Sequence, residues 1–81
     1  MRLDKYLKVS RLIKRRQVAN DACDAGRVSV NGKTARASYE VKIGDVIEIR
    51  FGEKLTSAEV LAVKESVRKE EAESMFRLLT Q

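Results

Sequence analysis

The side chains in this sequence that could most readily do chemistry are basic, and they are concentrated at one end. Residues 1–16 carry seven lysines and arginines against a single acid, Asp4, whereas the rest of the chain is nearly neutral. These seven are Arg2, Lys5, Lys8, Arg11, Lys14, Arg15 and Arg16. Guanidinium groups can make paired hydrogen bonds to phosphate oxygens, so the pattern is typical of a surface that binds a polyanion. A solvated helix face is the plainer alternative.

The first element that must position these side chains is a helix expected over residues 2–13. Leu3 and Leu7 are four residues apart and therefore share one face of a helix. The apolar residues that extend this face are Tyr6, Leu12 and Ile13. Lys5 and Lys8 fall on a different face. The leucines would thus anchor the helix while the basic side chains stay in solvent.

A second helix is expected from Arg15 or Arg16 to Ala25. Its apolar stripe consists of Val18, Ala19, Ala22 and Cys23. Gly26 follows the last periodic residue, where a left-handed C-terminal cap favours glycine. Arg15 and Arg16 would then lie at the N-terminus of this helix. Free backbone N–H groups and two guanidinium groups could together hold a phosphate there.

The pattern next changes to that of short strands. Val28 and Val30 alternate with polar residues, and Asn31-Gly32 is the pair that two-residue hairpin turns prefer. The return strand is expected over residues 33–37. Further strands are expected over residues 46–51, after a turn at Gly44-Asp45, and over residues 55–63.

A helix is expected from Ser66 to Leu79, with acidic residues early and Arg77 late, as the helix dipole favours. With 81 residues and 43% hydrophobic side chains, the chain should form one small folded unit. The expected class is α+β, with two short N-terminal helices packed on a small antiparallel sheet, plus a C-terminal helix.

The residue types argue against an enzyme. The sequence has no histidine, and its four glycines are spaced as turn residues rather than as a phosphate-binding loop. Cys23 is expected to be a small core residue, and Asp21 and Asp24 to lie on a solvated helix face. No catalytic residue, metal site or cofactor is therefore predicted. A single cysteine and the absence of a long apolar run point to the cytoplasm as the expected location.

The aromatic residues are too few for a base-stacking sheet. Tyr6, Tyr39, Phe51 and Phe76 are scattered, and the two phenylalanines fall on predicted core stripes. If the polyanion is RNA, recognition is expected to depend on its shape and backbone charge. Asp4 is then expected to cap or orient a neighbouring arginine rather than to contact the RNA.

Four runs of residues carry a resemblance to a known family. They are Arg2-Leu3-Asp4-x-x-Leu7, Ser10-Arg11-Leu12-Ile13-x-x-Arg16, Gly26-Arg27-Val28-x-Val30-Asn31-Gly32-Lys33 and Val41-x-x-Gly44-Asp45-x-Ile47. Together they resemble the RNA-binding domain named after small-subunit ribosomal protein four, the S-four domain. The resemblance implies that the two helices and the adjoining hairpin form the RNA surface. The RNA-binding residues predicted in this way are Arg2, Lys5, Lys8, Arg11, Lys14, Arg15, Arg16, Lys33 and Arg36. Gln17 departs from the family pattern of serine or threonine, so a hydroxyl cap is expected to be missing there.

The compact length and the tail after residue 67, Arg68-Lys69-Glu70-Glu71-Ala72-Glu73-x-Met75-Phe76, resemble the stand-alone bacterial ribosome-associated quality-control P factors (RqcP). This implies an S-four domain over residues 1–63 and a C-terminal helical extension over residues 64–81. It also implies binding to large ribosomal subunits that carry stalled peptidyl-tRNA, in support of C-terminal alanine tailing. The implied partners are rRNA, tRNA and other quality-control factors, with no membrane and a monomer off the ribosome.

Two alternatives stay open at this point. One is a generic structured-rRNA binder or a heat-shock-type factor that rescues or assembles large subunits, although the mildly acidic tail argues against the heat-shock type. The other is a regulatory protein-binding module whose basic surface docks on an acidic partner.

Overall fold

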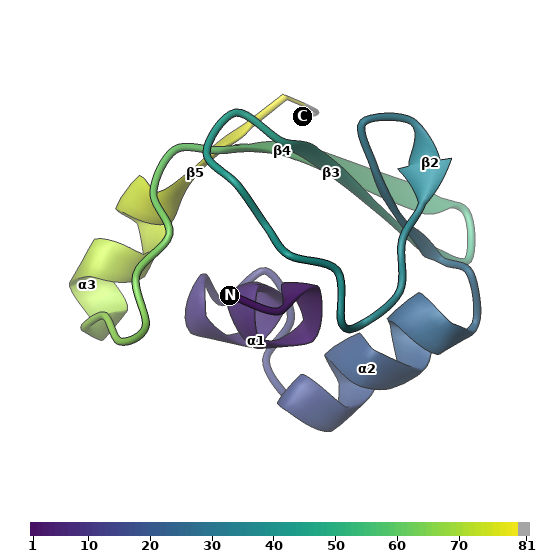
Figure 1. The fold of residues 1–81 in the computed structure, drawn as a ribbon, viewed down its shortest axis with the longest axis horizontal. Helices are drawn as coiled ribbons and strands as arrows, with labels where there is room; N and C mark the ends of the chain where they lie inside the picture. Colours follow the sequence, from purple (N-terminus) through teal and green to yellow (C-terminus); the bar gives the residue numbers. More distant parts are fainter. Residues whose placement is uncertain (80–81) are drawn as a thin grey trace.

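The computed structural model describes residues 1–79 and confirms the α+β class, with two helices against one face of an antiparallel sheet (Figure 1). The elements are α1 (Leu3–Val9), α2 (Arg16–Asp24), β1 (Val28–Val30), β2 (Lys33–Thr34), β3 (Val46–Phe51), β4 (Lys54–Val60), α3 (Lys69–Ala72), a 3₁₀ turn (Glu73–Met75) and β5 (Phe76–Leu78). The strand order is β2-β1-β3-β4-β5, and every neighbouring pair is antiparallel. No helix within residues 1–79 is both long and apolar enough to span a membrane.

The core lies between α1, α2 and the sheet. Its largest fully buried side chains are Tyr6, Leu3, Leu7, Ile47, Met75, Val28 and Val60. Leu3 and Leu7 share the buried face of α1, as their spacing predicts. This packing places α1 on the core and leaves the side chains of Arg2 and Lys8 exposed.

The first helix is shorter than predicted, because α1 ends at Val9 rather than at residue 13. Arg11 adopts a left-handed backbone conformation with φ of 65°, which no helix can continue through. The backbone N–H of Ile13 then donates to the carbonyl of Leu7 at 3.0 Å. Ile13 is still buried, but it reaches the core from the turn rather than from a helix face.

The second helix agrees with its predicted limits, and Gly26 caps it with φ of 76°. Ala19, Ala22 and Cys23 are buried as expected, but Val18 is 42% exposed. At 100° per residue, Val18 lies about 40° outside Ala22 and about 100° from Ala19, so it sits at the solvent edge of the stripe that packs on the core. The prediction for Val18 was therefore wrong.

The Asn31-Gly32 turn forms as predicted, with positive φ at both residues (53° and 85°). Its return strand β2 stops at Thr34, however, instead of running to residue 37. The chain then leaves the sheet and bonds to the start of α1. The N–H of Asp4 donates to Ala37 at 3.2 Å, and the N–H of Leu3 to Tyr39 at 2.8 Å.

The predicted helix from Ser66 to Leu79 was wrong in its extent, because only Lys69–Ala72 is α-helical and Phe76–Leu78 form β5. Phe76 pairs with Val60 and Leu78 with Ala58, so β5 supplies the hydrogen-bonding partner of β4. Residues 80 and 81 of the predicted extension lie outside the described residues.

The buried carbonyl of Met75 fixes the place where the C-terminal helical turn gives way to β5. It accepts hydrogen bonds from the hydroxyl of Tyr6 at 2.7 Å and from the N–H of Leu61 at 2.8 Å. These long-range bonds outweigh the helical spacing of the apolar residues.

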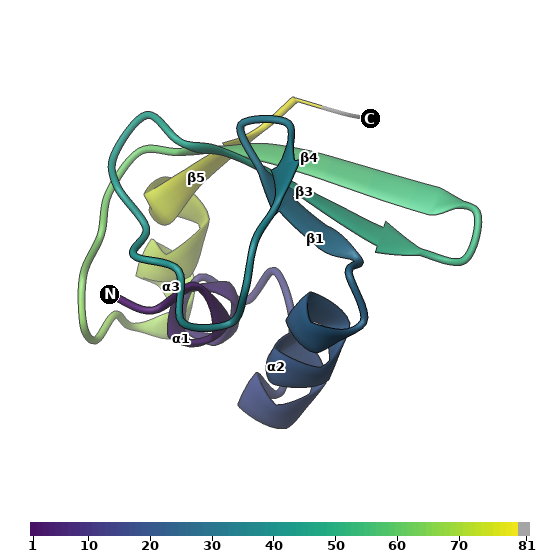
Figure 2. The same cartoon turned by 45° about the vertical axis from the view of Figure 1, so that its right-hand side comes forward.

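The two phenylalanines predicted to lie in the core are less buried than expected. Phe51 ends β3, at the tip of the β3–β4 hairpin, which extends past the helices in Figure 2. Its side chain is therefore 40% exposed. Phe76 is only partly buried.

Candidate RNA-binding surface

The basic N-terminal region is organised around one buried acid, Asp4, which is 2% exposed. Its carboxylate accepts hydrogen bonds from the Arg2 guanidinium at 3.2 and 3.4 Å, and a guanidinium nitrogen of Arg16 lies 3.5 Å away. The side-chain amide of Asn20 donates to the same carboxylate at 3.2 Å, and the backbone N–H of Lys5 does so at 2.8 Å. Asp4 therefore joins α1 to α2 and holds two arginines beside each other, although they are fourteen positions apart.

The electrostatics at Asp4 favour its ionised form. Burial by itself would raise the pKa of this carboxyl, but the hydrogen bond from Asn20 and the charges of Arg16 and Arg2 outweigh it, so the pKa lies below its ordinary value. The side chains of Arg2 and Arg16 remain 51% and 49% exposed. Each guanidinium group can thus contact Asp4 on one side and still present donors to an external anion.

Replacing Asp4 with asparagine is expected to lower the free energy of unfolding at neutral pH by about 1–2 kcal/mol, because hydrogen bonds to a charged acceptor are the stronger ones. Since the folded pKa of Asp4 is lowered, its stabilisation is complete above the ordinary value of 3.8 and is lost as the pH falls through the folded value. Urea unfolding from pH 7 to pH 2.5 should therefore show the gap between wild type and Asp4→Asn closing on acidification.

Asp21→Asn is the matched control for this measurement, because Asp21 is exposed and accepts a hydrogen bond from Gln17 on the surface of α2. It should change the free energy of unfolding by less than about 0.5 kcal/mol. A gap for Asp4→Asn that stays constant down to pH 2.5 would show that Asp4 does not stabilise the fold through its charge.

The N-terminus of α2 lies at Arg15 and Arg16, as the sequence predicts. Arg15 is the N-cap residue, and no side chain caps its end of the helix. Gln17 donates to Asp21 at 3.0 Å instead. Among the residues that the structure describes, no side chain accepts from the first N–H groups of α2, in agreement with the hydroxyl cap expected to be missing at Gln17. Lys14 and Arg15 are exposed next to this helix end.

Arg11 occupies the turn between the two helices in a conformation that costs an ordinary L-residue about 1–2 kcal/mol. Glycine or asparagine would be the usual residue there. Such strain is found disproportionately at binding and active sites. The backbone conformation at Arg11 therefore lowers stability, and this favours a binding role for its exposed side chain.

Arg11→Gly is expected to leave the free energy of unfolding unchanged or to raise it by up to about 1 kcal/mol, because relief of the positive φ outweighs the extra chain entropy of glycine. The same change should weaken binding to structured RNA. Arg11→Lys, which keeps both the charge and the strain, is the control in the two measurements. Destabilisation by more than about 1 kcal/mol would instead show that the Arg11 side chain holds the turn together.

The remaining predicted residues lie in different surroundings. Lys5 forms an ion pair with Glu65 at 2.8 Å, so its charge is partly neutralised within the protein. Lys8 and Arg11 line a small hollow together with Glu65. Lys33 and Arg36 are exposed around a separate hollow beside the β1–β2 hairpin. The structure thus brings Arg2 and Arg16 together and pairs Lys5 with Glu65. Lys33 and Arg36 form a second group beside the β1–β2 hairpin.

Two residues that position the surface were missed in the sequence. Asn20 borders the apolar stripe of α2, three residues before Cys23, and a polar residue at such a border is a usable signal for a partly buried hydrogen bond. Glu65 offered no comparable signal, because its contact with Lys5 spans most of the chain.

Within residues 1–79, Cys23 and the acidic side chains form no reactive or metal-binding cluster. Cys23 is buried, and this burial, together with the charges of Asp4 and Asp24, raises the pKa of its thiol to about 11. It therefore behaves as the core residue that the sequence predicts. Among residues 1–79, no group of three or more acidic or cysteine side chains is arranged to hold a metal ion.

Comparison with known proteins shows the family to which this chain belongs. The model of the S4 domain, the domain named after small-subunit ribosomal protein four, matches residues 1–47. An RQC P-site tRNA stabilizing factor from Halalkalibacterium halodurans is 56% identical over 96% of this chain and 89% of its own length. The factor of the same name from Bacillus subtilis is 53% identical, over 98% of this chain and 92% of its own.

Two solved structures share the fold. Heat shock protein 15 of Vibrio cholerae, described as a trimer, superposes with a TM-score of 0.88 at 32% identity, covering 96% of this chain and 80% of that one. The solution structure of the protein HP1423 superposes with a TM-score of 0.82 at 34% identity, covering all of this chain and 99% of that one. The chain therefore belongs to the S4 domain family and, within it, to the RQC P-site tRNA stabilizing factors.

Proposed function

We propose that this protein is a non-catalytic RNA-binding factor of ribosome-associated quality control. It binds large ribosomal subunits that carry stalled peptidyl-tRNA, steadies the tRNA, and thereby supports C-terminal alanine tailing of the nascent chain. The observation that carries the proposal is the pair Arg2 and Arg16, held side by side by the buried Asp4 beside the uncapped N-terminus of α2. The shared name of the relatives, P-site tRNA stabilizing factor, supports tRNA and the ribosome as the partners.

The geometry suits a polyphosphate ligand. Two half-exposed guanidinium groups fixed by a carboxylate lose little freedom when they bind phosphate, because their positions are already determined. The first N–H groups of α2 add further donors of partial positive charge. The proposed RNA-binding residues are Arg2, Lys5, Lys8, Arg11, Lys14, Arg15, Arg16, Lys33 and Arg36. Because Lys5 is paired with Glu65, we expect it to contribute less than Arg16.

The proposed role needs no bond to be made or broken by this chain. The ribosome and its other quality-control factors would supply the chemistry, while this protein holds rRNA and tRNA in place. We further propose that it acts in the cytoplasm and is a monomer when it is not on the ribosome.

Sedimentation tests the proposal directly. Tagged protein should travel with large subunits that bear peptidyl-tRNA in a sucrose gradient, and less with empty large subunits. A reporter whose translation stalls should receive alanine tails in cells that contain the protein and lose them in cells that lack it. Protein that stays at the top of the gradient would contradict the ribosomal role.

A rescue role of the heat-shock type is the second candidate, favoured by the superposition on heat shock protein 15. The alanine-tail readout separates the two, because a rescue factor would clear stalled subunits without requiring tails. The salt dependence of the affinity distinguishes binding to RNA from binding to an acidic protein partner. A surface making six or more phosphate contacts loses about 10³–10⁵-fold in affinity between 50 and 200 mM salt.

A further inference from the structure

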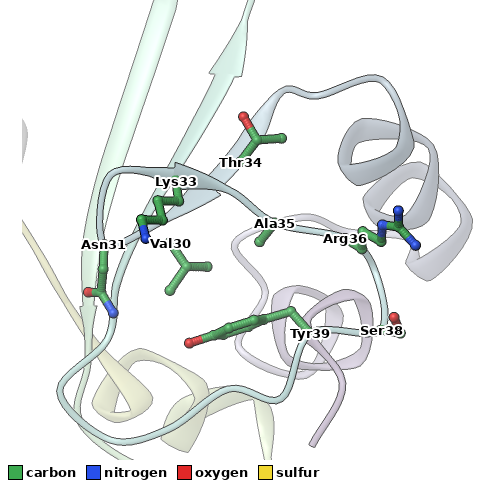
Figure 3. Close-up of a pocket in the computed structure, with 8 residues that line it drawn as sticks. All are labelled: Val30, Asn31, Lys33, Thr34, Ala35, Arg36, Ser38 and Tyr39. Atoms are coloured by element: carbon green, nitrogen blue, oxygen red, sulfur yellow. The ribbon is translucent and has the colours of Figure 1, made fainter.

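A hollow of about 560 Å³ lies between the β1–β2 hairpin and the chain that follows it (Figure 3). All of the residues that line it fall between Val30 and Tyr39. Its size falls in the range of about 300–1,000 Å³ that small ligands occupy in proteins. The hollow is separate from the arginine pair, because Arg2, Asp4 and Arg16 do not line it.

The lining combines one aromatic ring with apolar walls and two cations. Val30 and Ala35 are nearly buried and supply the apolar surface, and the half-buried ring of Tyr39 lies along one side, below them in Figure 3. Lys33 and Arg36 are exposed, and they lie on opposite sides of the hollow in Figure 3. An aromatic face beside cations is the chemistry that receives an unstacked nucleobase and its flanking phosphates.

The ring of Tyr39 is held in place from both ends of the side chain. Its hydroxyl donates to the carboxylate of Asp45 at 3.0 Å, and that carboxylate also accepts from the side chain of Asn31 at 3.0 Å and the N–H of Lys42 at 2.9 Å. The backbone N–H of Tyr39 donates to the carbonyl of Arg36 at 3.0 Å. A base that stacks here would therefore meet a ring that is already ordered, which lowers the entropic cost of binding.

The hollow is also connected to the arginine pair. The carbonyl of Tyr39 accepts from the N–H of Leu3 at 2.8 Å, and Glu40 forms a backbone bridge with Arg2. The chain that carries the ring is thus bonded directly to the start of α1. One RNA could contact Arg2 with a phosphate and place a neighbouring unpaired base in the hollow.

We propose that this hollow binds a single unpaired nucleobase of the RNA, stacked on the ring of Tyr39, with the adjoining phosphates near Lys33 and Arg36. The proposal rests on the proposed function, because it requires an RNA ligand. It adds a base contact to a surface that otherwise reads only the shape and charge of the backbone. Thr34 and Ser38 supply hydroxyl groups that can hydrogen-bond the edge of the base.

The test compares two short RNA hairpins that differ only at one bulged position in the stem, which holds either an unpaired uridine or an abasic nucleotide. Binding is measured by fluorescence anisotropy with the full chain. Stacking of one base on an aromatic side chain is worth about 1–3 kcal/mol, so wild type should prefer the uridine hairpin by about fivefold or more. Tyr39→Phe should keep this preference, and Tyr39→Leu should abolish it.

Phe76→Leu is the matched control, because it removes a half-buried aromatic ring that does not line the hollow, and it should keep the preference. Equal affinity of wild type for the uridine and abasic hairpins would overturn the base site while leaving RNA binding by the arginines intact. If wild type binds neither hairpin, RNA binding itself fails, and the base site with it. The comparison on wild type decides the proposal even if Tyr39→Leu does not fold.

Discussion

Replacing Arg2 and Arg16 together with alanine is expected to weaken binding to large ribosomal subunits by about 10²–10⁴-fold. Hydrogen bonds to charged groups are worth about 1.5–3 kcal/mol each, and the double change removes at least one such bond to phosphate at each position. The slope of log affinity against log salt should also fall by about one for each phosphate that the variant no longer neutralises. Alanine tailing of a stalled reporter should fall with the affinity.

The fold should survive this double substitution. Both arginines are about half exposed, and ion pairs at such positions contribute about 0–1 kcal/mol. Asp4 keeps its hydrogen bonds from Asn20 and from the backbone of Lys5. Urea unfolding should therefore show a loss of no more than about 2 kcal/mol.

Arg50→Ala is the matched control for charge, because Arg50 is exposed on β3, next in the strand to the buried Ile49, which faces the helices. It should change the affinity by less than about threefold. A double variant that is folded and still binds the subunits as wild type does would remove Arg2 and Arg16 from the binding surface. A double variant that is unfolded would show that the two arginines are structural.

Replacing Leu7 with alanine is expected to have the largest effect on stability, with a loss of about 2–5 kcal/mol. Leu7 is fully buried in the core between α1 and the sheet, and its removal leaves a cavity that the short α1 can fill only by moving. For a domain of this size, each kcal/mol corresponds to about 4–8 °C in Tm. Small domains have modest total stability, so this loss is a large fraction of it.

Urea unfolding and thermal melts followed by circular dichroism measure this loss. Leu61→Ala is the control, because Leu61 is 45% exposed and should lose less than about 1 kcal/mol. RNA affinity of Leu7→Ala, measured at a temperature where it remains folded, should stay close to that of wild type. A loss of affinity in the folded protein would show that the packing of α1 also sets the positions of the arginines.

The parts of the fold that could be predicted from the sequence depend on local signals. The second helix and its Gly26 cap, and the turn at Asn31-Gly32, follow from residue preferences within a few positions. The predictions that failed concern segments decided by distant contacts. The end of the C-terminal segment is a strand, despite its helical spacing, because Phe76–Leu78 form backbone hydrogen bonds with the edge of β4.

The first helix shows the same distinction within a single element. Its start was predictable from the spacing of Leu3 and Leu7, but its end was not. The helical spacing continues to Ile13, while the backbone reverses at Arg11 and the core still receives Ile13 from the turn. A periodic pattern records which residues are buried, and it does not record which backbone path buries them.

What the sequence alone determined about this protein is the chemical character of its surface: a net charge of +6 within residues 1–16 of a chain that contains no histidine. Charge density along a chain is a local property, and no fold can remove it. What only the tertiary structure decided is which of these charges act together. Arg2 and Arg16 meet because Asp4 is buried between α1 and α2, and Lys5 is turned toward Glu65. These contacts depend on packing between elements that are distant in the chain, which residue types and spacing do not specify.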